Sequence, residues 1–205
     1  MAIKPILFNT EMVRAILDGR KTCTRRLPRK QIEEKYIEYD EWVQAVAVPG
    51  CTYLREKEFY TQYPPYQPGD LMYVRETFIQ VAAHTFWYKA DDNSWISEGL
   101  HWKPSIHMPK EAARIWMKVT DVRVERLQDI TEDGAKAEGA NWKNGKNVGW
   151  EEKMKRTATE RFAEIWNSTI KKSDLDRYGW DANPYVFVIE FSKIDKPEEA
   201  EHERK

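Results

Sequence analysis

The segment Asn9 to Arg26 constrains the possible folds and functions of this chain more than any other. In it a short amphipathic helix is followed directly by a cluster of basic and hydroxyl side chains. Thr10 is predicted to cap the helix, because its hydroxyl can accept from a free backbone N–H of the first turn. The apolar stripe predicted to face the core consists of Met12, Val13, Ile16 and Leu17. Gly19 is predicted to end the helix, since glycine readily adopts the left-handed conformation found there.

The seven residues that follow this helix end, Arg20 to Arg26, hold four cations and two hydroxyls. Such a segment is too polar for an ordinary core, because a buried charge is costly unless it is paired. It suits an oxyanion, a phosphate or a polarised carbonyl group. Cys23 lies within the cluster without a histidine near it in sequence, so it is interpreted as a packing residue.

Lys21 and Thr24 lie three residues apart in this cluster. They would point to opposite faces of an extended strand, but they can converge in a turn or at a bulge. Neighbouring cations favour a neutral lysine amine, which could take the threonine proton and leave a nucleophilic alkoxide. In the alternative interpretation Lys21, Arg25 and Arg26 bind phosphates and the threonines assist. Spacing alone favours phosphate binding.

Composition limits the classes of partner. The chain has 205 residues, enough for one substantial core, and a net charge of −1. Basic and acidic residues nearly cancel, so a nucleic-acid coat or a membrane surface is not indicated, and any nucleic-acid contact must come from a local patch. Some of the nine tryptophans are expected to line a groove, although most should be packing residues.

Several motifs are missing from the sequence. The two cysteines and the lack of a secretory signal predict a cytoplasmic protein, and no apolar run approaches the ~20 residues of a membrane span. No two histidines have the i, i+4 spacing of a metal site, so no metal ligands are predicted. Because phosphate-loop and dinucleotide motifs are also lacking, we expect no cofactor.

Hydrophobic patterning predicts helices and strands in mixed order, and therefore an α+β fold. Strands are expected at Ile3–Phe8, Leu71–Phe78, Phe86–Asp91 and Tyr185–Ile194, the last in a central position. Ala113–Leu127 is predicted to be one long strand or a strand pair. Helices are expected at Ile130–Ala140, capped by Thr131, and at Thr157–Ile170. Residues 142–150 read as a loop and Asp92-Asn93 as a turn. One domain is predicted over residues 1–194, with an insertion or lid at about 28–67 and a charged, disordered tail at 195–205.

Three further regions offer candidate ligand-binding side chains. Arg75 and Glu76 place one charge on each face of a predicted strand, so at least one of them is either in a rim salt bridge or bonded within a site. The proline-fixed loop from His101 to Arg114 presents Trp102, Ser105 and His107. Glu138 falls in the last turn of a predicted helix, where the dipole disfavours an anion, so it is either solvent-facing or held for a task.

Five motifs occur in a recognisable order: GRKTCTRR at 19–26, PGDLMYVRETF at 68–78, a strand ending in DVRVERLQDIT, the helix AKAEGA at 135–140, and the closing strand YVFVIEF. Together they resemble the ASCH domain family, within the PUA-like superfamily of small β-barrels with flanking helices. WKPSIHMP and WDANPYV are similar to a phage and prophage branch. The resemblance implies a barrel that binds RNA or nucleosides.

One group in this family is similar to an amidohydrolase that removes the acetyl group of N4-acetylcytidine. The resemblance implies Thr24 as nucleophile, Lys21 as its base and Glu138 as proton shuttle. The chain is about twice as long as that group, and its insertion and HWKPSIHMP loop could reshape or cover the pocket. The other candidate substrate contacts are Arg25, Arg26, Arg75, Glu76, Trp102, Ser105 and His107.

Three functions therefore stay open. The leading hypothesis is an amidohydrolase acting on an acylated nucleoside, with Trp102 and His107 bounding the pocket. The second is a non-catalytic module that binds single-stranded RNA through Arg25, Arg26 and a tyrosine-rich segment. The third is a metal-independent ribonuclease, with Lys21 and Glu138 as acid and base.

Overall fold

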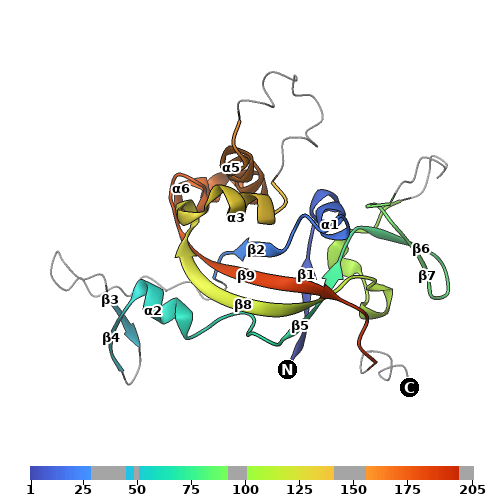
Figure 1. The fold of residues 1–205 in the computed structure, drawn as a ribbon, viewed down its shortest axis with the longest axis horizontal. Helices are drawn as coiled ribbons and strands as arrows, with labels where there is room; N and C mark the ends of the chain where they lie inside the picture. Colours follow the sequence, from blue (N-terminus) through green and yellow to red (C-terminus); the bar gives the residue numbers. More distant parts are fainter. Residues whose placement is uncertain (29–44, 49–50, 92–100, 141–155, 199–205) are drawn as a thin grey trace. The chain divides into compact units, whose positions relative to one another are not determined.

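The computed structural model describes residues 1–28, 45–48, 51–91, 101–140 and 156–198 (Figure 1). Five strands form a mixed sheet in the order β1 (Ile3–Leu7), β5 (Leu71–Arg75), β8 (Trp116–Arg126), β9 (Tyr185–Ile194) and β2 (Cys23–Arg26). β1 pairs parallel to β5, and β5 pairs antiparallel to β8. Two-stranded sheets are formed by β3 (Ala45–Val48) with β4 (Cys51–Arg55) and by β6 (Phe78–Ala82) with β7 (Thr85–Tyr88).

The helices in the described residues are short. They are α1 (Thr10–Leu17), α2 (Glu56–Thr61), α3 (Glu132–Ala137), α5 (Ala158–Thr169) and α6 (Leu175–Tyr178). Single 3₁₀ turns occur at η1 (Ser105–His107), η2 (Lys110–Ala112), η3 (Leu127–Asp129) and η5 (Lys172–Asp174). The predicted α+β class is therefore confirmed. Among the described strands no pairing closes the sheet into a barrel, so the PUA-like barrel stays a prediction.

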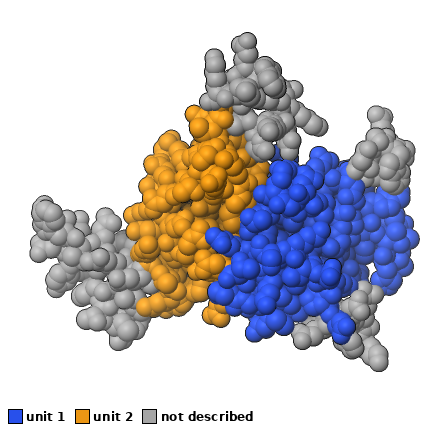
Figure 2. Space-filling view, in the orientation of Figure 1, with its two compact units in different colours: residues 1–22, 68–120, 190–205 blue, residues 23–67, 121–189 orange. Residues whose placement is uncertain are grey.

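The contacts of the chain divide it into two compact units (Figure 2). Unit 1 comprises residues 1–22, 68–120 and 190–205, and unit 2 comprises residues 23–67 and 121–189. The boundaries fall inside β8 and β9, so both strands contribute to each unit. The predicted single domain over 1–194 stays a prediction.

Each unit has its own apolar cluster. In unit 1 the cluster consists of Phe78, Met108, Ala112, Ala113 and Trp116. In unit 2, α3 and α5 pack against β9 through a cluster of buried residues (Figure 1). Its members are Leu127, Ile130, Ala135, Ala140, Ala158, Phe162, Trp166 and Val186. Apolar residues recur every third or fourth position along α5, so its buried side is a stripe.

Several expected boundaries are confirmed. β9 has the predicted bounds and lies between β8 and β2, and its run Val186–Ile189 is buried, as expected for a central strand. The Thr131 hydroxyl caps α3 by accepting from the Gly134 N–H at 3.0 Å. Gly19 has φ +71° and Gly139 has φ +84°, the left-handed conformation expected after a helix. α5 begins after Thr157, which forms a capping box with Glu160.

The predicted cap of the first helix is wrong. Asn9, not Thr10, is the cap: its backbone is extended and its Oδ1 accepts from the Met12 N–H at 2.9 Å. Thr10 is the first helical residue. The predicted stripe also shifts, because Val13, Ala15 and Ile16 are buried whereas Leu17 is 37% exposed.

We therefore expect Asn9→Ala to lower the free energy of unfolding by about 1 kcal/mol, because the first turn of α1 loses its side-chain acceptor. Thr10→Ala is the matched control, and it should change stability by less than about 0.5 kcal/mol. Urea unfolding of both variants measures the difference. Equal losses would contradict the assignment of Asn9 as the cap.

The predicted strand Leu71–Phe78 is interrupted. β5 ends at Arg75, and β6 begins at Phe78. Between them the Glu76 N–H points to the sulfur of Met108, 3.1 Å away, rather than to a neighbouring strand. The strand predicted at Phe86–Asp91 is also shorter and earlier, at Thr85–Tyr88.

Other expectations fall partly outside the described residues. Within the predicted insertion at 28–67, the structure describes the β3–β4 hairpin and α2. The predicted turn at Asp92-Asn93, the loop at 142–150 and the tail beyond residue 198 lie outside the described residues.

Candidate active site

Six polar or charged residues are buried in the part of the chain that the structure describes: Lys21, Thr24, Arg25, Asp70, Glu76 and Glu138. Sequence analysis selected five of them, all except Asp70. A buried polar group is costly unless its partners compensate, so such residues mark either ion pairs or sites of function. Their individual contacts separate these two cases.

Lys21 is positioned by the end of α1. After the left-handed Gly19, the backbone N–H groups of Arg20 and Lys21 both donate to the Ala15 carbonyl oxygen, at 2.8 and 3.0 Å. This turn directs the Lys21 side chain inward, where only 2% of the residue is exposed. Its ammonium nitrogen lies 5.4 Å from the centroid of the Phe8 ring. The lysine is therefore buried beside Phe8 in unit 1 rather than exposed to solvent.

Thr24 lies in β2, and 2% of it is exposed. Beside it in β2, the Cys23 sulfur lies 3.9 Å from the Gly134 carbonyl oxygen of α3, so this helix covers β2 at Cys23. Cys23 is 5% exposed, which confirms the expectation that it is a packing residue.

Arg25 bridges two carboxylates. Its Nη1 donates to Glu138 at 3.4 Å and its Nη2 donates to Glu125 at 3.2 Å. Its guanidinium carbon also lies 5.8 Å from the centroid of the Phe162 ring. Because protein carboxylates already neutralise this buried cation, the phosphate-binding interpretation loses support at Arg25.

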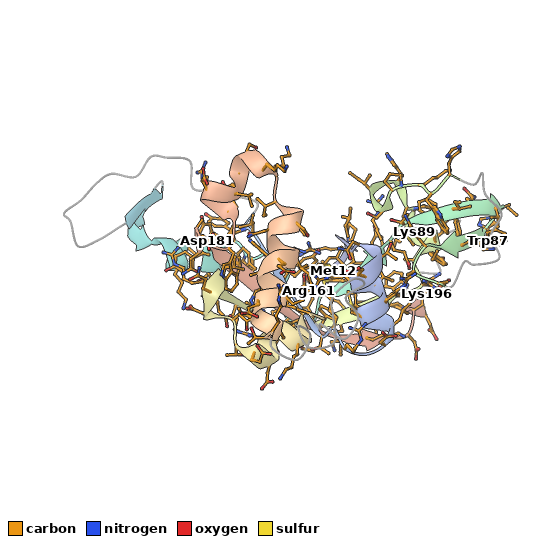
Figure 3. The ribbon with its side chains drawn as sticks, turned by 90° about the horizontal axis from the view of Figure 1, so that it is seen from above. Met12, Trp87, Lys89, Arg161, Asp181 and Lys196 are labelled. Atoms are coloured by element: carbon orange, nitrogen blue, oxygen red, sulfur yellow. The ribbon has the colours of Figure 1, made fainter. Side chains whose placement is uncertain are left out.

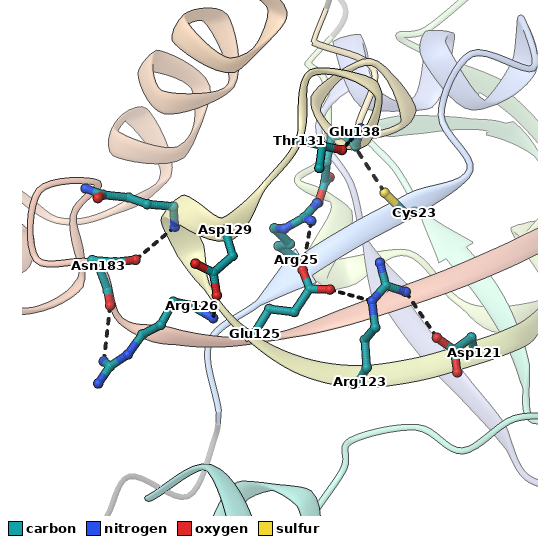
Figure 4. A network of polar contacts seen from close by, with 12 residues as sticks. Cys23, Arg25, Asp121, Arg123, Glu125, Arg126, Asp129, Thr131, Glu138 and Asn183 are labelled. Carbon is teal, nitrogen blue, oxygen red and sulfur yellow. Dashed lines mark hydrogen bonds and ion pairs between the residues drawn. The ribbon is translucent and has the colours of Figure 1, made fainter.

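Glu138 is the C-cap residue of α3, and 7% of it is exposed. The solvent-facing alternative for this carboxylate is therefore wrong. The helix dipole disfavours an anion at this end, and the ion pair with Arg25 offsets that cost. α3 thus ends with a buried acid in contact with β2 inside unit 2 (Figure 4).

Arg26 is partly buried in the same unit. Burial lowers the pKa of its guanidinium, whereas the charges of Glu138 and Tyr66 raise it. Glu138 therefore interacts with two cations: Arg25 donates a hydrogen bond to it, and its charge raises the pKa of Arg26.

The remaining candidates lie in unit 1. Arg75 donates through Nε to the Met108 carbonyl oxygen at 2.8 Å and through Nη2 to the Ile106 carbonyl oxygen. It therefore holds the η1 turn, in which Ser105 is partly buried and His107 is exposed. Trp102, which precedes this turn, is partly buried.

Glu76 forms a buried ion pair rather than a rim salt bridge. Its residue is 1% exposed, and both carboxylate oxygens accept from Arg114, at 2.9 and 3.1 Å. Burial raises the pKa of Glu76, although the hydrogen bond and charge of Arg114 oppose this shift. Arg114 also donates to Asp91 and lies 4.0 Å from the centroid of the Tyr88 ring. Burial raises the pKa of Tyr88 to about 12. Glu76, Arg114 and Asp91 therefore form a network of ion pairs that stabilises the fold.

The predicted site residues thus divide between the units. Unit 1 holds Lys21, Arg75, Glu76, Trp102, Ser105 and His107, and unit 2 holds Thr24, Arg25, Arg26 and Glu138. Sequence reasoning missed Glu125, Arg123 and Asp121, which continue the polar chain from Arg25. Their spacing of two residues along β8 is a signal that could have identified them as one face of a strand.

In the described part of the chain, no group of three or more histidine, cysteine, aspartate or glutamate side chains could hold a metal ion. None of the described helices is both long enough and apolar enough to cross a membrane.

No protein-family model, curated protein or solved structure matches this chain. The resemblance to the ASCH domain family therefore stays a prediction that rests on the sequence motifs alone.

Proposed function

We propose that this protein is an amidohydrolase that removes the acyl group from an acylated nucleoside such as N4-acetylcytidine, on a PUA-like fold of the ASCH type. One observation carries the proposal: Lys21, Thr24 and Glu138 are each less than 10% exposed. Burying a lysine, a threonine and a glutamate costs desolvation free energy, and buried groups of these types are candidates for a reactive site.

In the proposed reaction the Lys21 amine takes the proton of the Thr24 hydroxyl. The resulting alkoxide attacks the acyl carbonyl carbon and forms a tetrahedral intermediate. The carboxylate of Glu138 relays this proton from Lys21 to the departing exocyclic nitrogen as the carbon–nitrogen bond breaks. The products of this half-reaction are the free nucleoside and an acyl ester on Thr24.

Water completes the cycle. Lys21, now a neutral amine again, takes a proton from the attacking water. As the ester bond breaks, Thr24 regains its proton and the carboxylic acid is released. No metal or organic cofactor enters either half-reaction. This scheme uses only acid–base and nucleophilic chemistry.

RNA binding is the competing function. Arg25 counts against it, because its guanidinium is buried between Glu125 and Glu138. A phosphate would have to displace these carboxylates, and phosphate contacts are normally made by solvent-accessible cations.

Turnover tests the proposal directly. Purified protein incubated with N4-acetylcytidine should release cytidine and acetate, as measured by chromatography, and Lys21→Met should abolish the release. The exposed Lys118 provides a matched control, since Lys118→Met should keep full activity. Salt-dependent binding of single-stranded RNA without any release of cytidine would favour the binding module instead. Cleavage of a fluorescent RNA without metal would favour the ribonuclease.

A further inference from the structure

The polar chain in unit 2 extends beyond the proposed catalytic acid. Figure 4 shows Asp121, Arg123, Glu125 and Arg25 in succession, with alternating charge. Arg123 donates to Asp121 at 3.1 Å and to Glu125 at 2.5 Å, and Arg25 then connects Glu125 to Glu138. The outer members are partly exposed, whereas the side chains of Arg25 and Glu138 are 3% and 4% exposed. The chain therefore runs from the surface to the buried acid.

The guanidinium of Arg25 is fixed by this chain. Its two terminal nitrogens each meet a different carboxylate, and its face lies toward Phe162. Gly134 lies against Nη2, because a Cβ at this glycine would be 3.6 Å from that atom. Nε is buried and has no hydrogen-bond partner among the described residues. The hydrogen bonds to the two carboxylates therefore set the directions of Nη1 and Nη2, and Phe162 and Gly134 pack against the group.

We propose that Arg25 is a positioning residue, which holds the carboxyl group of Glu138 by bridging it to Glu125. The inference rests on the proposed function, in which Glu138 moves a proton. It replaces the expectation that Arg25 contacts the substrate. A planar guanidinium can serve two carboxylates in fixed directions, whereas the ammonium group of a lysine is a point charge without that geometry.

This role predicts a particular kinetic change. Arg25→Lys keeps a positive charge but loses the two guanidinium nitrogens that donate to Glu138 and Glu125. The carboxyl group of Glu138 is then no longer held in place. We expect kcat for N4-acetylcytidine to fall about 10- to 100-fold, because a small misplacement of a catalytic group has effects of this size. KM should change less than about twofold, since substrate contacts are untouched. Glu125→Gln should lower kcat in the same direction but less.

The matched control is Arg161→Lys, which also lies in unit 2. Arg161 is on α5 (Figure 3), and its Nη1 donates to the exposed Glu164 at 3.2 Å. This variant should keep the kcat and KM of the wild type. Circular dichroism at the assay temperature measures the folded fraction of each variant. A fall in kcat that merely equals the fall in folded fraction would overturn the proposal.

Other outcomes are equally decisive. A rise in KM with unchanged kcat would identify Arg25 as a substrate contact and overturn the positioning role. Unchanged kinetics of Arg25→Lys, while Glu138→Gln is inactive, would overturn it as well. Absence of turnover by the wild type would instead remove the proposed function.

A measurement without substrate then decides whether the bridge exists. Arg25→Lys should shift the urea midpoint less in the Glu138→Gln background than in the wild type, because the two residues interact. Equal shifts would show that Arg25 does not hold Glu138.

Discussion

Replacing Thr24 by valine should lower kcat/KM for N4-acetylcytidine by about 10³- to 10⁶-fold, the range seen when a catalytic nucleophile is removed. Valine keeps the branched shape of threonine but has no hydroxyl, so no alkoxide can form. Because Thr24 is 2% exposed in β2, a similar shape is needed to preserve packing. Thr24→Ser, which keeps the hydroxyl, should retain measurable turnover.

Thr22→Val is the matched control for this prediction. Thr22 belongs to the same basic segment but is exposed, and its backbone carbonyl oxygen accepts from the Phe191 N–H at 2.9 Å. A side-chain substitution leaves that bond in place. Activity should therefore be unchanged. Equal loss of activity in both variants would show that the segment matters for folding or charge rather than for nucleophilic attack.

Arg114→Met should lower the free energy of unfolding by about 3–5 kcal/mol at pH 7, the largest stability effect that we expect. Methionine fills much of the space of the arginine stem but leaves the buried Glu76 carboxylate without its cation. Urea unfolding monitored by tryptophan fluorescence measures the loss. Asp91→Asn removes only the half-exposed partner of Arg114 and should change the unfolding free energy by less than about 1 kcal/mol.

The pH dependence provides a second test of the same pair. Burial already raises the pKa of Glu76 above its ordinary value of 4.5, and loss of Arg114 removes the interactions that oppose this shift. Because the raised pKa favours the protonated folded form, the variant should lose stability relative to the wild type as pH rises through the folded pKa. Below pH 4.5 the carboxyl is protonated in both proteins, and most of the difference should vanish. A difference that does not depend on pH would contradict a role for the Glu76 charge.

Local patterns predicted some elements well. The apolar run Val186–Ile189 fixed β9, since four consecutive buried residues require a strand covered on both faces. Thr131 was predicted as a cap because it precedes a helical pattern and carries a suitable oxygen. Thr157 was predicted only as the first residue of a helix, and the structure shows it as the cap. The error at Asn9 and Thr10 arose because both residues can cap a helix, and only backbone geometry distinguishes them.

Tertiary contacts could not be predicted in this way. Glu76 and Arg114 are 38 residues apart, and their pairing follows from how the segments after β5 and before β8 meet. The end of β5 at Arg75 likewise depends on Met108, which is distant in sequence. Lys21, Thr24 and Glu138 were selected from their chemistry and from the family resemblance, but their burial was not predicted. The bridge from Glu125 through Arg25 was not, since an alternating charged strand does not reveal its partner.

The central proposal is that Lys21, Thr24 and Glu138 act together in one catalytic mechanism. A kinetic double-mutant cycle tests this proposal most directly. The kcat/KM for N4-acetylcytidine would be measured for the wild type, Lys21→Met, Thr24→Val and the double variant, with each protein confirmed to be folded. Residues that act together give strongly non-additive losses. We predict that the double variant is no more than about tenfold worse than either single variant. Independent, additive losses would contradict the claim, as would wild-type protein that releases no cytidine.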